Sequence, residues 1–240
     1  MRSEKVWISN IIRNHDTEWL DYNLSVEGKI DSQFLLQYSH ILSQKERQET
    51  EGDFKKNNSN YVNLIVKYKE NKNISSEYNP SSFYKMPEEH LVCDKSIFMV
   101  MDQLIFINEK SAEILKQYNL GNTDIIKLDP YDAVSGGRIE CECSFYLLNI
   151  AETNEYCDLE KSQNIRFFKP TKKMEGIPKE QIDIVEDGFI ISSNILESGL
   201  DLWADSRLKQ SFFISDRLKK ALDDAGIAQD WLLTRCVVEG

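Results

Sequence analysis

The sequence predicts a mixed α+β fold with mainly antiparallel sheets and single helices, because runs of strand length outnumber helical segments. A unit that occurs twice supports this class. Its first copy is Phe-Ile-Asn-Glu-Lys at residues 106–110, and its second is Phe-Ile-Ser-Asp-Arg at residues 213–217. Each copy is followed by a helical segment and then by an apolar run, so the chain contains two related units of strand, cap, helix and strand.

Capping residues mark where the two helices begin. Asn108 and Ser215 are short polar residues of the kind that accept a hydrogen bond from the first turn of a helix. Glu109 and Asp216 follow them and place a negative charge near the positive end of the helix dipole. These residues predict helices that begin directly after Asn108 and Ser215.

The second helix has one apolar face and a clear end. Residues at positions i, i+3, i+4 and i+7 make the face, and they are Leu218, Ala221, Leu222 and Ala225. Gly226 closes this helix, because glycine adopts the left-handed conformation that follows a helix without strain. Asn119 occupies the equivalent place in the first copy, and asparagine is the next-best residue for that conformation.

Apolar runs predict further strands at residues 96–101, 104–107, 124–128, 138–150, 165–168, 187–192 and 231–238. The first third of the chain is less regular. Residues 44–60 are rich in Glu, Lys, Gln and Asn, which predicts an exposed loop or a frayed helix. Residues 61–68 are β-rich and partly alternating, which predicts a strand. We therefore divide the chain into an irregular N-terminal region, residues 1–90, packed on or inserted beside the core, and an α+β domain, residues 91–240.

The chain is acidic, with 29 Lys and Arg against 40 Asp and Glu in 240 residues and a formal net charge of −11. Phosphate groups would be repelled, so neither nucleic acid nor an anionic membrane is an expected partner. A basic protein partner is favoured instead, although solubility alone explains the same acidity. No apolar run reaches the length of a signal peptide core or a membrane helix, and the five cysteines lack framework spacing. We expect a cytoplasmic protein with reduced thiols.

The residues offer no strong catalytic or cofactor-binding pattern. The best candidates for metal ligands are His90, Cys93, Cys141 and Cys143. Two residues separate the first pair, as in many zinc sites, but only one separates Cys141 from Cys143. On a strand these two sulfurs would share a face, where buried cysteines act as small hydrophobic residues. All three histidines lie in the first ninety residues, and no nucleophile elbow or glycine-rich phosphate loop is present, so we expect no catalytic residues, metal or cofactor.

Two acidic clusters are candidates for a surface that binds a cationic partner. One consists of Glu140 and Glu142, which share a face of the predicted strand 138–150. The other consists of Asp183, Glu186 and Asp187. Such residues usually form only a solvated surface, but opposite a basic protein they would make a docking patch.

Six segments of the C-terminal two thirds of the chain together resemble a known family. They are residues 107–115, 145–149, 157–162, 201–203, 213–218 and 221–226. In this order and spacing they resemble immunity protein family 11, a group of bacterial immunity proteins of polymorphic toxin systems that was formerly a domain of unknown function. The resemblance implies a non-enzymatic cytoplasmic protein that binds a cognate toxin and occludes its active site. Such a toxin is often a nuclease, whose basic cleft would suit an acidic partner.

Two other functions stay open from the residues. One is a small metal-dependent hydrolase that would use His90, Cys93 and a carboxylate. The other is a structural or regulatory homo-oligomer, such as a homodimer, in which the repeated units pack against each other or against a sister chain.

Overall fold

The computed structural model describes residues 5–11, 20–74, 77–163, 165–166, 181–182, 185–208 and 211–240. The chain forms two compact units. Unit 1 comprises Met1–Asn14, Glu113–Thr123 and Ile150–Gly240, and unit 2 comprises His15–Ala112 and Asp124–Asn149. The chain therefore passes between the units several times, and the region 1–90 contributes residues to both of them.

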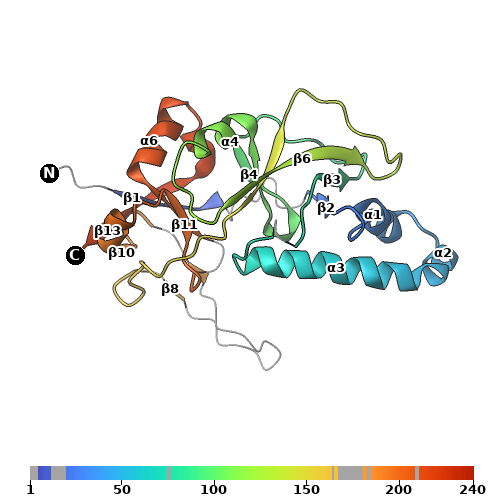
Figure 1. Ribbon diagram of the computed structural model, residues 1–240, viewed down its shortest axis with the longest axis horizontal. Coiled ribbons are helices and arrows are strands. Elements are labelled where there is room, and N and C mark those ends of the chain that lie inside the picture. The colour runs from blue at the N-terminus through green and yellow to red at the C-terminus, as the bar shows by residue number, and fades with distance from the viewer. Residues whose placement is uncertain are drawn as a thin grey trace. The chain divides into compact units, whose positions relative to one another are not determined.

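The expected α+β class with mainly antiparallel sheets is confirmed (Figure 1). Unit 1 contains β1 (Val6–Ser9), β8 (Ile165–Arg166), β9 (Gln181–Ile182), β10 (Ile190–Ser192), α5 (Asn194–Ser198), β11 (Leu202–Ala204), β12 (Phe212–Ser215), α6 (Asp216–Asp224), the 3-10 helix η3 (Ala228–Trp231) and β13 (Leu233–Glu239). Unit 2 contains β2 (Asn23–Ser25), α1 (Ser32–His40), α2 (Gln44–Glu49), α3 (Glu51–Lys69), β3 (Ser82–Lys85), β4 (Ile97–Met99), the 3-10 helix η2 (Met101–Gln103), β5 (Ile105–Asn108), β6 (Asp124–Asp132) and β7 (Phe145–Asn149). Helix α4 (Glu109–Leu115) begins among the residues of unit 2 and ends among those of unit 1.

The two main sheets share one strand order. In unit 2 the strands run β4-β5-β7-β6-β3, with β2 added at the end, and in unit 1 they run β11-β12-β1-β13-β10. The first three pairings in each sheet are antiparallel, and the fourth, β6 with β3 or β13 with β10, is parallel. The repeated unit is therefore larger than the sequence pattern indicates, and it extends to five strands.

One strand reaches its place in the shared order by a different route in each unit. In unit 2 the middle strand β7 follows β6 along the chain, whereas in unit 1 the N-terminal strand β1 fills that position. Val6 pairs with Ser215 on one side and with Cys236 on the other. The two sheets thus have the same arrangement, but the middle strand comes last along the chain in unit 2 and from the N-terminal end of the chain in unit 1.

Both predicted helix starts are confirmed. The Asn108 side-chain oxygen accepts from the Ser111 N–H at 2.9 Å, and the Ser215 hydroxyl oxygen accepts from the Leu218 N–H at 3.2 Å. In α6, Leu218 and Leu222 are fully buried, as the apolar face predicts. Each hydroxyl or amide side chain here satisfies an N–H group that the helix itself leaves without a partner.

The expected helix end is confirmed in the second copy and wrong in the first. Gly226 has the left-handed conformation, with φ of 71°. Asn119 does not, because α4 already ends at Leu115, and Asn119 instead binds the segment before β11. Its backbone N–H donates to the Asp201 carboxylate at 2.9 Å, and its side-chain amide donates to the Gly199 carbonyl at 3.1 Å. The residue connects two distant segments of unit 1 and does not terminate the helix.

The predicted strand at residues 61–68 is wrong, whereas residues 44–60 are mostly exposed and helical, which agrees with the helical one of the two alternatives for them. Residues 61–68 form the last turns of α3, beside which α1 packs, and not a strand (Figure 1). The polar stretch before them supplies α2 and the first turns of α3. Tyr61, Leu64, Ile65 and Tyr68 are buried at helical spacing and join the core of unit 2. This core includes Phe83, Phe98, Phe106, Phe145 and Leu147, so α3 covers one face of the six-stranded sheet.

Candidate partner-binding site

Residues 140–144 of unit 2 form a segment outside the sheet, exposed at 140–142 and half-buried at 143–144. The predicted strand 138–150 is shorter in the structure, where β7 begins only at Phe145. Before this segment, Arg138 bridges to Tyr131 and the Ile139 N–H donates to the Pro130 carbonyl at 2.9 Å. After Ile139 the pairing with β6 stops. The acidic residues of the segment therefore project from irregular backbone and not from a strand face.

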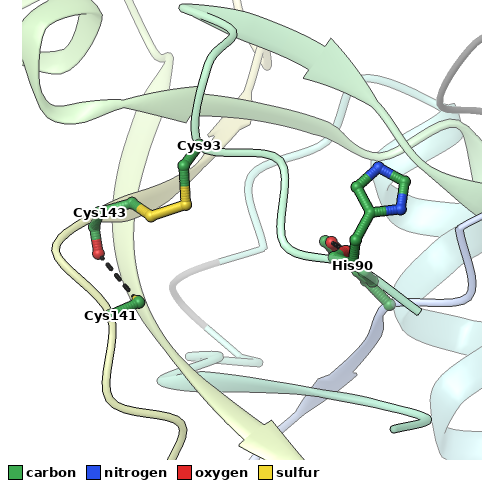
Figure 2. The surroundings of a disulfide bond; sticks show 5 residues. His90, Cys93, Cys141 and Cys143 are labelled. Carbon is green, nitrogen blue, oxygen red and sulfur yellow. Dashed lines mark hydrogen bonds between the residues drawn. A yellow bond between two sulfur atoms is a disulfide. The ribbon is translucent and has the colours of Figure 1, made fainter. Parts of the chain in front are cut away.

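A disulfide bond joins this segment to another part of unit 2. Cys93 and Cys143 are bonded with a Cα–Cα distance of 5.7 Å (Figure 2). The expectation that all five cysteines are reduced is therefore wrong. Cys93 is exposed, while Cys143 is half-buried and packs against the core of unit 2. The covalent bond holds the segment beside the loop that precedes β4, and no ladder hydrogen bond between the described residues joins the two.

The same bond removes the metal-ligand group considered from the sequence. Two of its four members share a sulfur–sulfur bond and cannot bind a metal as thiolates. Figure 2 shows the His90 imidazole pointing away from the sulfur atoms, and the His90 carbonyl accepts a hydrogen bond from the Tyr22 hydroxyl. Across the residues that the structure describes, no group of three or more His, Cys, Asp or Glu is placed to hold a metal ion.

Glu140 and Glu142 present free negative charge on this segment. Both side chains are exposed, and none of the described residues forms an ion pair with either carboxylate. Cys141 lies between them and is an exposed free thiol. Its Sγ atom donates to the Cys143 carbonyl at 3.4 Å, as the dashed line in Figure 2 marks. We call residues 140–143, with their bond to Cys93, the tethered acidic segment.

The second predicted acidic cluster differs in its charge. Asp183 lies outside the described residues. Asp187 in unit 1 accepts two hydrogen bonds from the Arg235 guanidinium, whose Nε lies 2.7 Å from Oδ1, and Glu186 lies 3.4 Å from the same guanidinium. The Arg235 side chain holds the pKa of Asp187 below its ordinary value. Because a cation of the same unit already neutralises much of this charge, Glu186 and Asp187 are weaker candidates than Glu140 and Glu142.

Unit 1 also contains a polar network that sequence reasoning did not identify as a site. Asp201, only 1% exposed, accepts from the Ser215 hydroxyl at 2.5 Å and from Arg217 Nη2 at 2.8 Å. An open cavity of about 380 Å³ is lined in part by Ser215, Arg217, Lys5 and Lys220. In the sequence, the only feature that pointed to Asp201 was its place before Leu202 and Trp203 in one of the six segments that resemble the family. The bonds of Asp201 are satisfied within unit 1, so we assign the network to stability.

Two buried thiols in unit 1 contrast with the exposed Cys141. Burial raises the pKa of Cys157 to about 11 and also raises the pKa of Cys236. We expect iodoacetamide at pH 8 to label Cys141 in the folded protein and to label Cys157 and Cys236 only after unfolding in urea, because the thiolate is the reactive form. Peptide mass spectrometry of the labelled protein measures this, and rapid labelling of Cys157 in the native state would contradict its burial.

The raised pKa of Cys157 also predicts a pH dependence of stability. The folded state favours the protonated thiol, so this contribution is present below about pH 9 and is lost as the pH rises through about 11. Urea unfolding at pH 8 and pH 11 should show a smaller loss of stability for Cys157→Ser than for the unchanged protein. If both proteins lost the same stability between pH 8 and pH 11, groups other than Cys157 would control the alkaline unfolding.

Comparison with known proteins adds no relative to this description. No family model matches the chain, and no curated protein matches it. Among the described residues, none of the helices has both the length and the apolar character needed to cross a membrane.

Proposed function

We propose that this protein is a cytoplasmic immunity protein, without catalytic activity of its own, that binds a cognate bacterial toxin and occludes the toxin's active site. The resemblance of six segments to immunity protein family 11 is the basis of this proposal. The net charge of −11 supports a basic partner, such as a nuclease effector with a phosphate-binding cleft. We propose the tethered acidic segment as part of the surface that meets this toxin.

We choose the tethered acidic segment as the toxin-binding surface because the carboxylates of Glu140 and Glu142 have no ion-pair partner among the described residues. A carboxylate that already has a cationic neighbour gains little from a second one, whereas an unpaired, exposed carboxylate contributes its full field to an approaching cation. The disulfide to Cys93 limits the conformations of the segment before binding. Less conformational entropy is then lost in the complex, which favours affinity.

Removing these two charges should slow association with the toxin. We expect Glu140→Gln with Glu142→Gln to lower the association rate constant by about 3-fold to 10-fold at low salt, with a smaller change in the dissociation rate constant. Surface plasmon resonance at several salt concentrations measures both rates. The difference between variant and unchanged protein should shrink as salt rises, because salt screens exposed charges.

A matched control comes from the same unit. Glu27 and Asp53 are also exposed carboxylates, and Glu27→Gln with Asp53→Asn removes the same total charge outside the tethered acidic segment. This control should change the association rate constant by less than about 2-fold, since only the mean charge is altered. If both double variants lowered the association rate constant equally, the tethered acidic segment would be excluded as the binding surface. The net negative charge of the protein would then account for the attraction.

The toxin itself is best sought in the gene adjacent to that of this protein. Co-expression should protect cells from that toxin, and the two proteins should co-purify as a stoichiometric complex in which the toxin is inactive. A neighbouring toxin that kills cells despite co-expression and forms no complex would refute the proposal. Bound metal near one equivalent in the purified protein would instead favour the hydrolase.

A further inference from the structure

Three cysteines of unit 2 lie on the tethered acidic segment and the loop bonded to it. Cys93 and Cys143 are disulfide-bonded, and Cys141 is a free thiol only two residues before Cys143. We propose that Cys141 exchanges with this disulfide, so that Cys93 bonds alternately to Cys143 and to Cys141. The tethered acidic segment would then be attached to Cys93 at either of two residues, Cys143 or Cys141. The chemistry needs no partner protein, whereas its biological role rests on the proposed function.

Access to the reacting atoms favours this exchange. Cys93 and Cys141 are both exposed and Cys143 is half-buried, whereas Cys157 and Cys236 are buried. The Cys141 Sγ lies 3.4 Å from the carbonyl oxygen of Cys143, which places the free thiol beside the bonded residue (Figure 2). Exposed disulfides are the labile ones, and attack by a neighbouring thiolate is the usual route of exchange.

Few backbone hydrogen bonds between described residues oppose a shift of residues 140–144. Between Ile139 and Phe145 no backbone N–H donates a hydrogen bond to another described residue. Moving the bond from Cys143 to Cys141 shifts the attachment by two residues, or about 6.6 Å at an extended rise of about 3.3 Å per residue. Within residues 140–144 no ladder hydrogen bond has to break for this shift, because the sheet pairing resumes only at Phe145. The ladder contact next to the segment is the bond from the Ile139 N–H to the Pro130 carbonyl.

The exchange is balanced without any added oxidant or reductant. The Cys141 thiol loses its proton to solvent, and the thiolate attacks the Cys93 Sγ. A bond forms between Cys141 and Cys93 while the bond between Cys93 and Cys143 breaks. The electron pair leaves on the Cys143 Sγ, which takes up a proton, so one disulfide and one thiol remain.

The shift would move the surface proposed for toxin binding. Glu140 and Glu142 flank Cys141, so a bond at Cys141 draws both carboxylates toward the loop at Cys93. Disulfides in cytosolic proteins are typically transient or redox-sensing. An exposed disulfide with a third thiol beside it has the features of a transient bridge, and the acidic segment would be presented in two ways, with Cys93 bonded to Cys143 or to Cys141.

Peptide mapping of the intact, folded protein tests the exchange. The protein is incubated for hours at pH 8 with a glutathione redox buffer, alkylated, and digested without reduction by a protease that cleaves after glutamate. Cleavage after Glu142 separates Cys141 from Cys143, so mass spectrometry distinguishes the two bridges. We expect both the Cys93–Cys143 and the Cys93–Cys141 peptide pairs, because uncatalysed disulfide rearrangement takes minutes to hours.

Single substitutions give the matched controls. Cys141→Ser should show only the Cys93–Cys143 pair, whereas Cys143→Ser should form the Cys93–Cys141 pair. Cys157→Ser, at a buried thiol, should leave both pairs unchanged. The proposal is overturned if the unchanged protein shows Cys141 alkylated throughout and Cys143→Ser leaves Cys93 and Cys141 unbonded. This result would not affect the proposed function, which toxin binding tests separately.

Discussion

Phe106→Ala and Phe213→Ala are each expected to lower the free energy of unfolding by about 3 to 5 kcal/mol, the range for removing a fully buried phenylalanine ring. The two residues occupy equivalent positions of the repeated unit, and both are 0% exposed. Phe106 contacts the rings of Phe83 and Phe98, with centroids 5.3 Å and 5.6 Å away, and Phe213 stacks on Trp203 at 5.6 Å. Each substitution leaves a cavity that its aromatic neighbours cannot fill.

The location of the damage should differ between the two variants. Amide hydrogen exchange is expected to show lost protection in unit 2 for Phe106→Ala and in unit 1 for Phe213→Ala, because Phe106 belongs to the core of unit 2 and Phe213 to the core of unit 1. Phe→Leu at the same positions keeps most of the volume and should cost less than about 1.5 kcal/mol. Urea unfolding gives the magnitudes. A loss below about 1 kcal/mol for both alanine variants would contradict the packing described here.

Local signals explain which parts of the fold were predictable. Asn108 and Ser215 identified their helices because a cap acts within three residues of itself. The wider equivalence of the two sheets was not visible, because β1 joins β12 and β13 across more than two hundred residues. Pairing at that distance depends on the whole core, and a pattern in one short segment cannot specify it.

The errors have the same physical origin. Residues 61–68 contain alternating apolar residues that suit a strand, but packing of Tyr61, Leu64 and Tyr68 against the sheet selects the helix. The disulfide joins residues 50 positions apart, a spacing with no local signature. The acidic residues of the candidate site could be predicted from the sequence, but their surroundings could not. Glu140 and Glu142 were identified as acids, whereas the tether that holds them, the start of β7 only after them and the Arg235 partner of Asp187 come only from tertiary structure.

Asp201→Asn is expected to cost about 2 to 4 kcal/mol, because the buried carboxylate gathers several donors at one point. Besides Ser215 and Arg217, it accepts from the Asn119 N–H at 2.9 Å. An amide replaces one acceptor oxygen with an NH2 group, which then faces donors. Asp223→Asn serves as the control, since Asp223 is an exposed partner of Lys219 and its loss should cost less than about 0.5 kcal/mol.

A double-mutant cycle with Arg217→Met separates the charge from the neutral hydrogen bonds. Arg217→Met alone leaves the Asp201 carboxylate buried without its cation, so it should also destabilise the protein. In that background Asp201→Asn should cost less than it does alone, because an amide is easier to bury than an unpaired carboxylate. Urea unfolding of the four proteins measures the coupling. The Arg217 side chain is 60% exposed. Strictly additive losses would mean that solvent screens its charge from Asp201, and that the hydrogen bonds from Ser215 and Asn119 stabilise Asp201 without it.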